Sequence, residues 1–171
     1  MNGPLSSIPW KTPALWQEAN NSLRRSVSRH RRRLAEPIRL ANRLRRRLQS
    51  IFPLMDELCL QTCPACPDVC CGHAWVWADL KDLLFFHLAD IPVPDRQLLS
   101  RRGEHCRYAG SRGCRMDRLQ RPFVCAWYLC PAQIRLLREH PANHARLTAT
   151  LQQIKIERRL MEDLFIRAVF K

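Results

Sequence analysis

Nine cysteines are the residues of this chain best suited to chemistry, and eight of them form two groups of four. In the first group, Cys63 and Cys66 are separated by two residues, and a short loop of this kind can direct both thiolates at one metal ion. The neighbours Cys70 and Cys71 more easily serve two adjacent sites than a single ion. The candidate metal ligands are Cys63, Cys66, Cys70 and Cys71 in the first group and Cys106, Cys114, Cys125 and Cys130 in the second.

Disulfide bonding is the less favoured interpretation of these cysteines. The sequence begins without a basic leader followed by an apolar block, which predicts a cytoplasmic location. In that reducing compartment, clustered cysteines usually bind metal or do redox work. A count of nine also does not fit a closed set of bridges. We therefore expect metal chelation, in preference to a set of buried apolar thiols.

The identity of the metal is left open by the residues, because thiolate ligands suit both zinc and iron–sulfur clusters. A histidine, either His73 or His105, could complete one site, and His73 could equally be a bystander. Cys59 lies outside the main spacing and is expected to be a core or spare thiol. His87 lies on the apolar face of a predicted helix and is expected to be a core histidine.

The distribution of charge suggests a second class of function, nucleic-acid binding. The formal net charge is +14, and residues 1–50 hold Lys11 and eleven arginines against Glu18 and Glu36. Such a block could contact phosphates, but no aromatic stacking platform or nucleic-acid motif accompanies it. A solvated helix face is therefore favoured. The arginines of residues 101–121 have a local role available, since guanidinium groups lower thiol pKa values and offset ligand charge.

Apolar residues recur at helical spacing before and after the cysteines, and no segment shows the alternation of a strand. Pro37 is expected to interrupt the first helical stretch, and Pro53 to break it or to begin a short helix. Asp79 is expected to cap the start of a helix in "DLKDLLFFHLAD". Residues 101–122 are rich in Gly and Arg and are expected to be loop.

The end of the chain is expected to form two helices. Pro131 suits the first position of a helix, Pro141 closes that helix, and Asn143 caps the last one. The predicted fold is mostly α, a small irregular cysteine-cluster metal-binding domain flanked by helical extensions. The domains are an Arg-rich helical extension over 1–55, the cysteine-cluster domain over 56–130 and C-terminal helices over 131–171. No apolar run is long enough for a transmembrane segment.

The stretches "CPACPDVCC" and "CRYAGSRGCRMDRLQRPFVC" resemble the bacterial cysteine-cluster proteins of the YkgJ type, which are described as a zinc- or iron-chelating domain. The resemblance covers about residues 60–130 and includes Arg121 and Pro122 of an Arg-Pro-x-x-Cys ending. Three residues precede the paired cysteines, where the usual form has two. The resemblance implies zinc or iron, with iron–sulfur assignments for some relatives, including flagellin lysine methylases. It matches the family's cysteines to Cys63, Cys66, Cys70, Cys71, Cys106, Cys114 and Cys125.

The sequence therefore predicts a protein that chelates zinc or an iron–sulfur cluster, in a structural or redox role. The alternative is a nucleic-acid-binding protein that uses its Arg-rich N-terminal helices beside a structural zinc domain. No Gly-rich cofactor loop, Ser-His-Asp set or pair of carboxylates indicates a reaction, and a protein partner is not identified.

Overall fold

The computed structural model describes residues 8–64, 66–67, 70–72, 75–101, 103–110 and 113–170, and most of them are helical. This confirms the mostly helical fold. A pair of two-residue antiparallel strands places Ala109 opposite Cys114. The elements are α1 (Pro13–Arg29), α2 (Ala35–Thr62), η1 (Cys70–Gly72), α3 (Leu80–Leu88), β1 (Ala109–Gly110), β2 (Gly113–Cys114), η2 (Arg118–Gln120), α4 (Phe123–Trp127), α5 (Pro131–Arg138) and α6 (Pro141–Phe170).

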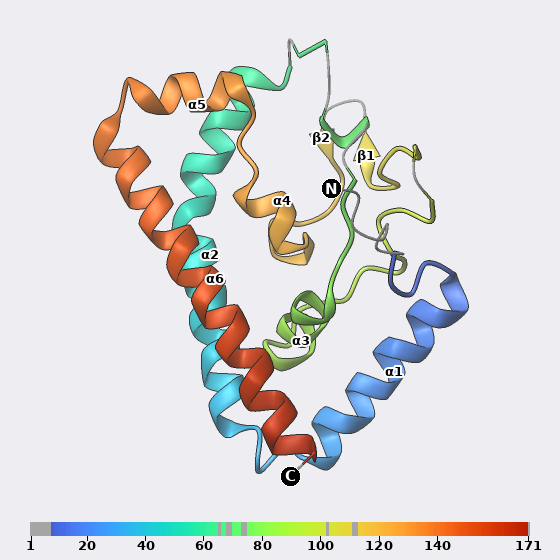
Figure 1. The fold of residues 1–171 in the computed structure, drawn as a ribbon. Helices are drawn as coiled ribbons and strands as arrows, with labels where there is room; N and C mark the ends of the chain where they lie inside the picture. The colour runs from blue at the N-terminus through green and yellow to red at the C-terminus, as the bar shows by residue number, and fades with distance from the viewer. Residues whose placement is uncertain are drawn as a thin grey trace, which may run out of the picture.

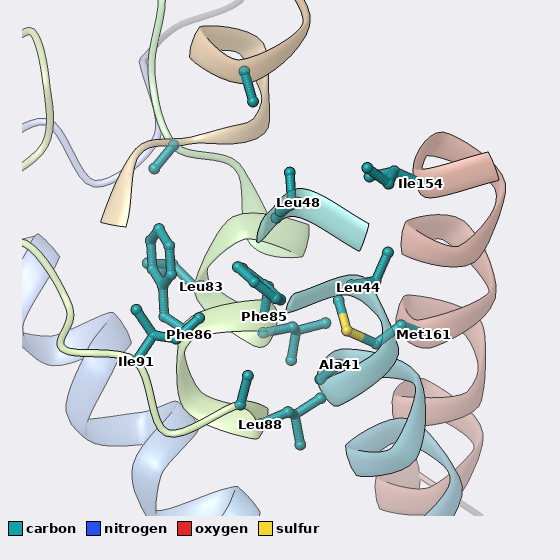
Figure 2. Close-up of a cluster of buried hydrophobic side chains, with 14 of the residues drawn as sticks. Ala41, Leu44, Leu48, Leu83, Phe85, Phe86, Leu88, Ile91, Ile154 and Met161 are labelled. Atoms are coloured by element: carbon teal, nitrogen blue, oxygen red, sulfur yellow. The ribbon is translucent and has the colours of Figure 1, made fainter. Parts of the chain in front are cut away.

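The two longest helices, α2 and α6, run side by side in opposite directions along one side of the molecule (Figure 1). The short helix α3 packs against both of them and against α1. Apolar side chains of α2 and α6 meet those of α3 in a core, part of which is drawn in Figure 2. Leu44, Phe86 and Met161 are at most 1% exposed there. We call α2, α3 and α6 the helical frame.

Helix α2 continues through Pro53, so the break expected at this proline is wrong. A proline inside a helix removes one backbone hydrogen bond and crowds the preceding turn. Here Pro53 lies on the exposed face, while Ile51 and Met55 on either side are buried. Burial of these flanking residues favours a continuous helix over a break, and water can satisfy the carbonyl that loses its partner.

The interruption expected at Pro37 lies just before it, at residues 30–34 between α1 and α2. Pro37 itself is in the first turn of α2, where a missing N–H costs little. At the other end of the chain, Pro131 begins α5 as expected. The helix start expected at Asn143 is wrong, because α6 already begins at Pro141. A proline at the first helical position is preorganised for a helix and needs no N–H donor there.

The capping residue expected for α3, Asp79, is confirmed. Its Oδ1 accepts the backbone N–H of Asp82 (2.9 Å), and Asp82 Oδ2 accepts the backbone N–H of Asp79 (2.9 Å). Asp82 is buried, and its Oδ1 also binds Arg158 Nη1 of α6 (2.7 Å). Burial raises the pKa of Asp82 to about 6, and Arg158 together with the N–H donors favours its ionised form.

A second buried charge joins α2 to α6. Glu157 of α6 is 5% exposed and forms ion pairs with Arg43 (3.4 Å) and Arg47 (3.1 Å) of α2. A buried carboxylate is costly unless it is paired. Two of the eleven arginines near the N-terminus therefore have a structural partner within the frame.

The segment after α3 is fixed by the buried amide of Gln97. Its Oε1 accepts the N–H of Ala78 (2.8 Å) and its Nε2 donates to the carbonyls of Ala78 (3.0 Å) and Pro9 (3.1 Å). One residue later, the Leu98 carbonyl accepts the N–H of Arg107 (3.2 Å). These bonds position the chain that leads into Cys106.

Across the described ranges, no helix is both long enough and apolar enough to cross a membrane.

Candidate metal centre

The cysteines lie toward the end of the molecule where α2 finishes and α5 begins (Figure 1). Cys59 is in the last turn of α2, Cys63 is its C-cap residue, and Cys130 is the N-cap residue of α5. Cys70 and Cys71 begin η1. Cys66 lies in the chain between α2 and η1, and the other three, Cys106, Cys114 and Cys125, come from the segment before β1, from β2 and from α4.

A backbone hydrogen bond joins the two cysteine groups that the sequence separates. The N–H of Cys106 donates to the carbonyl of Cys71 (3.0 Å). The chain then turns at Ala109, whose N–H donates to the Cys106 carbonyl (3.0 Å), and the β1–β2 pairing returns Cys114 opposite Ala109. Cys106 is only 7% exposed. The fold thus brings Cys71, Cys106 and Cys114 to one place.

Cys125 joins them through α4. The N–H of Phe123 in the first turn of this helix donates to Asp82 Oδ1 (2.9 Å), which ties α4 to the helical frame. The Arg121 side chain donates to the Met116 carbonyl from Nε (3.1 Å) and Nη2 (3.0 Å), and so fixes the loop before α4. Cys125 is therefore positioned by the bond between α4 and Asp82 and by the ordered loop that precedes α4. We call Cys71, Cys106, Cys114 and Cys125 the inner thiols.

The pKa values of these thiols depend on one another. Burial, and then the charges of Cys106 and Cys114, raise the pKa of Cys125 to about 12. Burial and the charge of Cys114 also raise the pKa of Cys106. The hydrogen bond with Cys70 raises the pKa of Cys71, as do burial and the charges of Cys106 and Cys114. Without a cation, these three thiols are protonated at neutral pH.

A second set of thiols lies at the end of α2. The N–H of Cys63 donates to the carbonyl of Cys59 (2.8 Å), and the two thiols are hydrogen-bonded to each other. The charge of Cys70 helps to raise the pKa of Cys63, after the larger effects of burial and of Cys59. The side chain of Cys59 also accepts hydrogen bonds from Arg118 Nη2 (3.7 Å) and Gln133 Nε2 (3.6 Å). Cys59, expected to be a core or spare thiol, contacts this polar set.

Of the two histidines considered as ligands, His105 is described by the structure, and His73 lies outside the described residues. His105 lies beside the cysteines, because a Cβ added at Gly72 would come within 3.3 Å of its Cδ2 atom. A side chain at Gly72 would therefore push against His105, next to Cys71.

His87, expected to be a satisfied core histidine, is hydrogen-bonded but only half-buried at the edge of the core. Its Nε2 lies 2.9 Å from Asn20 Oδ1. Asn20 Nδ2 donates to the Trp16 carbonyl (2.8 Å), which leaves Oδ1 as the acceptor and places the proton on His87 Nε2. Burial, and then the charge of Arg24, lower the pKa of His87.

The chemistry of the donors fits a thiophilic metal, and their present spacing does not yet form a site. In the part of the chain that the structure describes, no group of three His, Cys, Asp or Glu side chains is arranged to hold one ion. Thiols that bind a metal often reach their final positions only with the ion. The donor set therefore fits zinc or iron, and binding would require the sulfurs to converge.

The arginine-rich region lies at the other end of α2. Arg31, Arg32 and Arg33 are exposed in the turn between α1 and α2, around a hollow of about 840 Å³ lined by residues 28–33. The 28 residues of α2 separate this turn from Cys63 by about 42 Å at 1.5 Å per residue. The two features are therefore distant from each other.

Comparison with models of protein families, with curated proteins and with solved structures gave no match.

Proposed function

We propose that this protein binds zinc or an iron–sulfur cluster through its cysteines. The observation that carries the proposal is the hydrogen bond from the Cys106 N–H to the Cys71 carbonyl (3.0 Å), which joins the two cysteine groups. Cys114 and Cys125 are brought to the same place by the β1–β2 pairing and by the contact between α4 and Asp82. Four cysteine sulfurs are a usual ligand set for either metal.

The electrostatics of the inner thiols support a cation as their partner. Each thiolate among Cys71, Cys106 and Cys125 is opposed by burial or by its neighbours' charge, so the metal-free protein holds them as thiols. A bound cation would reverse this, because it favours the thiolate, and binding would release protons. The resemblance to YkgJ-type proteins supports the same proposal.

Two roles are compatible with this chemistry. Four thiolates with no open position make a structural site, whereas an iron–sulfur cluster adds electron transfer. The bound group would supply that chemistry, and the residues of this chain would hold it and limit its contact with water. Within the proposal, the side chains beside the sulfurs then matter as much as the ligands do.

Nucleic-acid binding is the less supported alternative. It rests on the exposed Arg31, Arg32 and Arg33. Other members of the arginine block already have carboxylate partners, since Arg39 pairs with Glu36 and two more bind Glu157. The block therefore has a partly structural explanation.

The test is the metal content of the full chain purified without oxygen and with a reductant. Zinc, iron and acid-labile sulfide are measured per chain, together with the visible absorption spectrum. We expect at least one zinc per chain in a colourless protein, or iron with sulfide in a brown one. Cys125→Ser should lose metal, because Cys125 belongs to the inner thiols.

Tyr128→Phe is the matched control, since it lies three residues from Cys125, is 46% exposed and leaves every thiol in place. It should keep the metal content of the unaltered chain. A chain that retains neither zinc nor iron after purification, and takes up neither when zinc or iron plus sulfide is supplied, would contradict the proposal.

A further inference from the structure

The surroundings of Cys59 differ from those of a spare core thiol. A buried cysteine without a function behaves as a small apolar residue with a weakly bonding sulfur. Cys59 Sγ instead accepts hydrogen bonds from Arg118 Nη2 (3.7 Å) and Gln133 Nε2 (3.6 Å), besides its bond with the thiol of Cys63. A sulfur that receives two N–H donors, one of them from a guanidinium, is in polar surroundings, unlike a thiol packed among apolar side chains.

Gln133 is oriented for this contact by its own partners. It is 6% exposed, and its Oε1 accepts the N–H of Cys130 (3.2 Å) at the start of α5. This bond fixes the amide so that its NH₂ group faces Cys59, across 74 residues of sequence. A nine-tenths buried amide directed at a sulfur indicates a position built around that sulfur.

Arg118 is held in the same way. Its Nε binds the carboxylate of Asp56, one turn before Cys59 in α2, and its guanidinium lies 5.8 Å from the centre of the Phe52 ring. The side chain is only 14% exposed. Asp56 balances part of the positive charge, and Nη2 remains directed at Cys59. The arginine is thus restrained from three sides.

The paired cysteines separate the inner thiols from those at the end of α2. Cys71 binds Cys106 through its backbone, and its thiol is affected by Cys106 and Cys114. The backbone hydrogen bond thus ties Cys71 to the inner thiols, which leaves Cys70 as the member of the pair that can serve the other set.

We infer that this protein has a second thiolate metal site, the outer site, formed by Cys59, Cys63, Cys66 and Cys70. Cys66 completes it because its N–H donates to the Cys63 carbonyl (3.2 Å), which closes the short loop between them. Cys130 is left out of this site, because its contact with the Gln133 amide is made by its backbone N–H, whereas Cys59 contacts that amide through its sulfur. The inference rests on the proposed function, and it adds Cys59 to the ligands and removes Cys130.

The experiment counts metal sites in the full chain and in three variants, in the presence of a reductant. One arm supplies Zn²⁺, and a second supplies iron and sulfide without oxygen. Co²⁺ is also titrated, because thiolate–cobalt absorption reports the sites one by one. We expect two sites in the unaltered chain, one in Cys59→Ser, one in Cys125→Ser and two in Cys130→Ser, with the helical circular dichroism of each retained.

The metal content of the variants distinguishes failure of the outer site from failure of the proposed function. An unaltered chain that binds none of these metals overturns the proposed function itself. A chain that binds metal, but keeps its full content in Cys59→Ser, overturns the outer site and leaves the proposed function intact. Loss of all metal in both Cys59→Ser and Cys125→Ser would indicate one joint site and also overturns the inference.

A variant that keeps every thiol guards against misfolding of Cys59→Ser. Arg118→Met preserves an apolar stem beside Phe52 and removes the donor to Cys59. Loss of such a supporting contact typically lowers metal affinity by about 10- to 100-fold. We expect one of the two metals to transfer to a chelator at correspondingly lower chelator concentration, with the other unchanged. Unchanged transfer of both metals would contradict the role given to Arg118.

Discussion

The helical frame and the cysteine end of the molecule are stabilised in different ways. In the frame, whole side chains of α2, α3 and α6 are buried, among them Leu44, Phe86 and Ile154 at 1% exposure or less (Figure 2). At the cysteine end, the elements between α3 and α5 span two to five residues, and Cys63 and Cys70 are exposed. The frame is stabilised by apolar burial. At the cysteine end, hydrogen bonds such as those of Phe123 and Cys106 hold the short elements together.

The two regions meet at Asp82. This residue belongs to α3, binds Arg158 of α6, and accepts the N–H of Phe123 at the start of α4. The guanidinium of Arg158 also lies 4.8 Å from the centre of the Phe123 ring. A change here tests whether the cysteine end is attached to the frame mainly through one buried ion pair.

Asp82→Ala should have the largest effect on stability. It leaves Arg158 with Asp79 alone, at a position where the Arg158 side chain is 7% exposed, and it removes the acceptor for Phe123. Breaking a buried ion pair on one side costs about 3–5 kcal/mol. The measurement is the free energy of unfolding in denaturant.

Glu36→Ala is the control for Asp82→Ala, since it removes an exposed ion pair with Arg39 and should cost less than about 1 kcal/mol. Equal losses in the two variants would show that Asp82 does not join the two regions. Amide hydrogen exchange should also show α4 losing protection first in Asp82→Ala.

If the proposed metal is bound, its removal should have the next largest effect, confined to one region. If the cysteine end is ordered by its metal, a chelator should weaken amide protection around Cys106 and in α4, while α2 and α6 stay protected. Metal binding supplies much of the local folding energy in small thiolate sites. Protection at the cysteine end is expected to fall by at least about tenfold, which corresponds to about 1.4 kcal/mol.

The chelator experiment is read by hydrogen exchange with mass spectrometry, and the helical circular dichroism should change little. Loss of protection throughout α2 and α6 would contradict the comparison, because the frame would then depend on the metal as well. Unchanged protection at the cysteine end would show that this region folds without metal.

Acid should have the smallest effect, and it acts on the frame. The folded protein lowers the pKa of His87, through burial and the charge of Arg24. Below pH 6.5, which is the ordinary pKa of histidine, His87 of the unfolded chain binds a proton more readily than His87 of the folded protein does. The contribution of His87 to the free energy of unfolding should therefore fall as pH drops below about 6.5, while the raised pKa of Asp82 acts in the opposite direction.

Replacing His87 tests that assignment. His87→Gln keeps a side-chain N–H donor for Asn20 and should reduce the loss of stability in this pH range. His144→Gln, at an exposed position, is the control and should leave the pH dependence unchanged. An equal pH dependence in the His87 variant and the unaltered chain would show that another group is responsible.

Local sequence patterns predicted those parts of the fold whose causes are local. The helical spacing of apolar residues, the cap at Asp79 and the proline at the start of α5 act within one or two turns. The pattern was insufficient at Pro53, because packing of the residues around it outweighs the local cost of a proline. Asp82 gave no signal of its own, since its partners Phe123 and Arg158 are far away in sequence.

The sequence by itself determined a mostly helical chain with two groups of cysteines, because helical periodicity and ligand spacing are both properties of short segments. The tertiary structure decided which sulfurs are neighbours. The Cys106–Cys71 bond and the contacts from Arg118 and Gln133 to Cys59 join segments 35 to 74 residues apart. Such pairings depend on how the helices pack, so no local pattern could show that Cys59 lies within the thiol set.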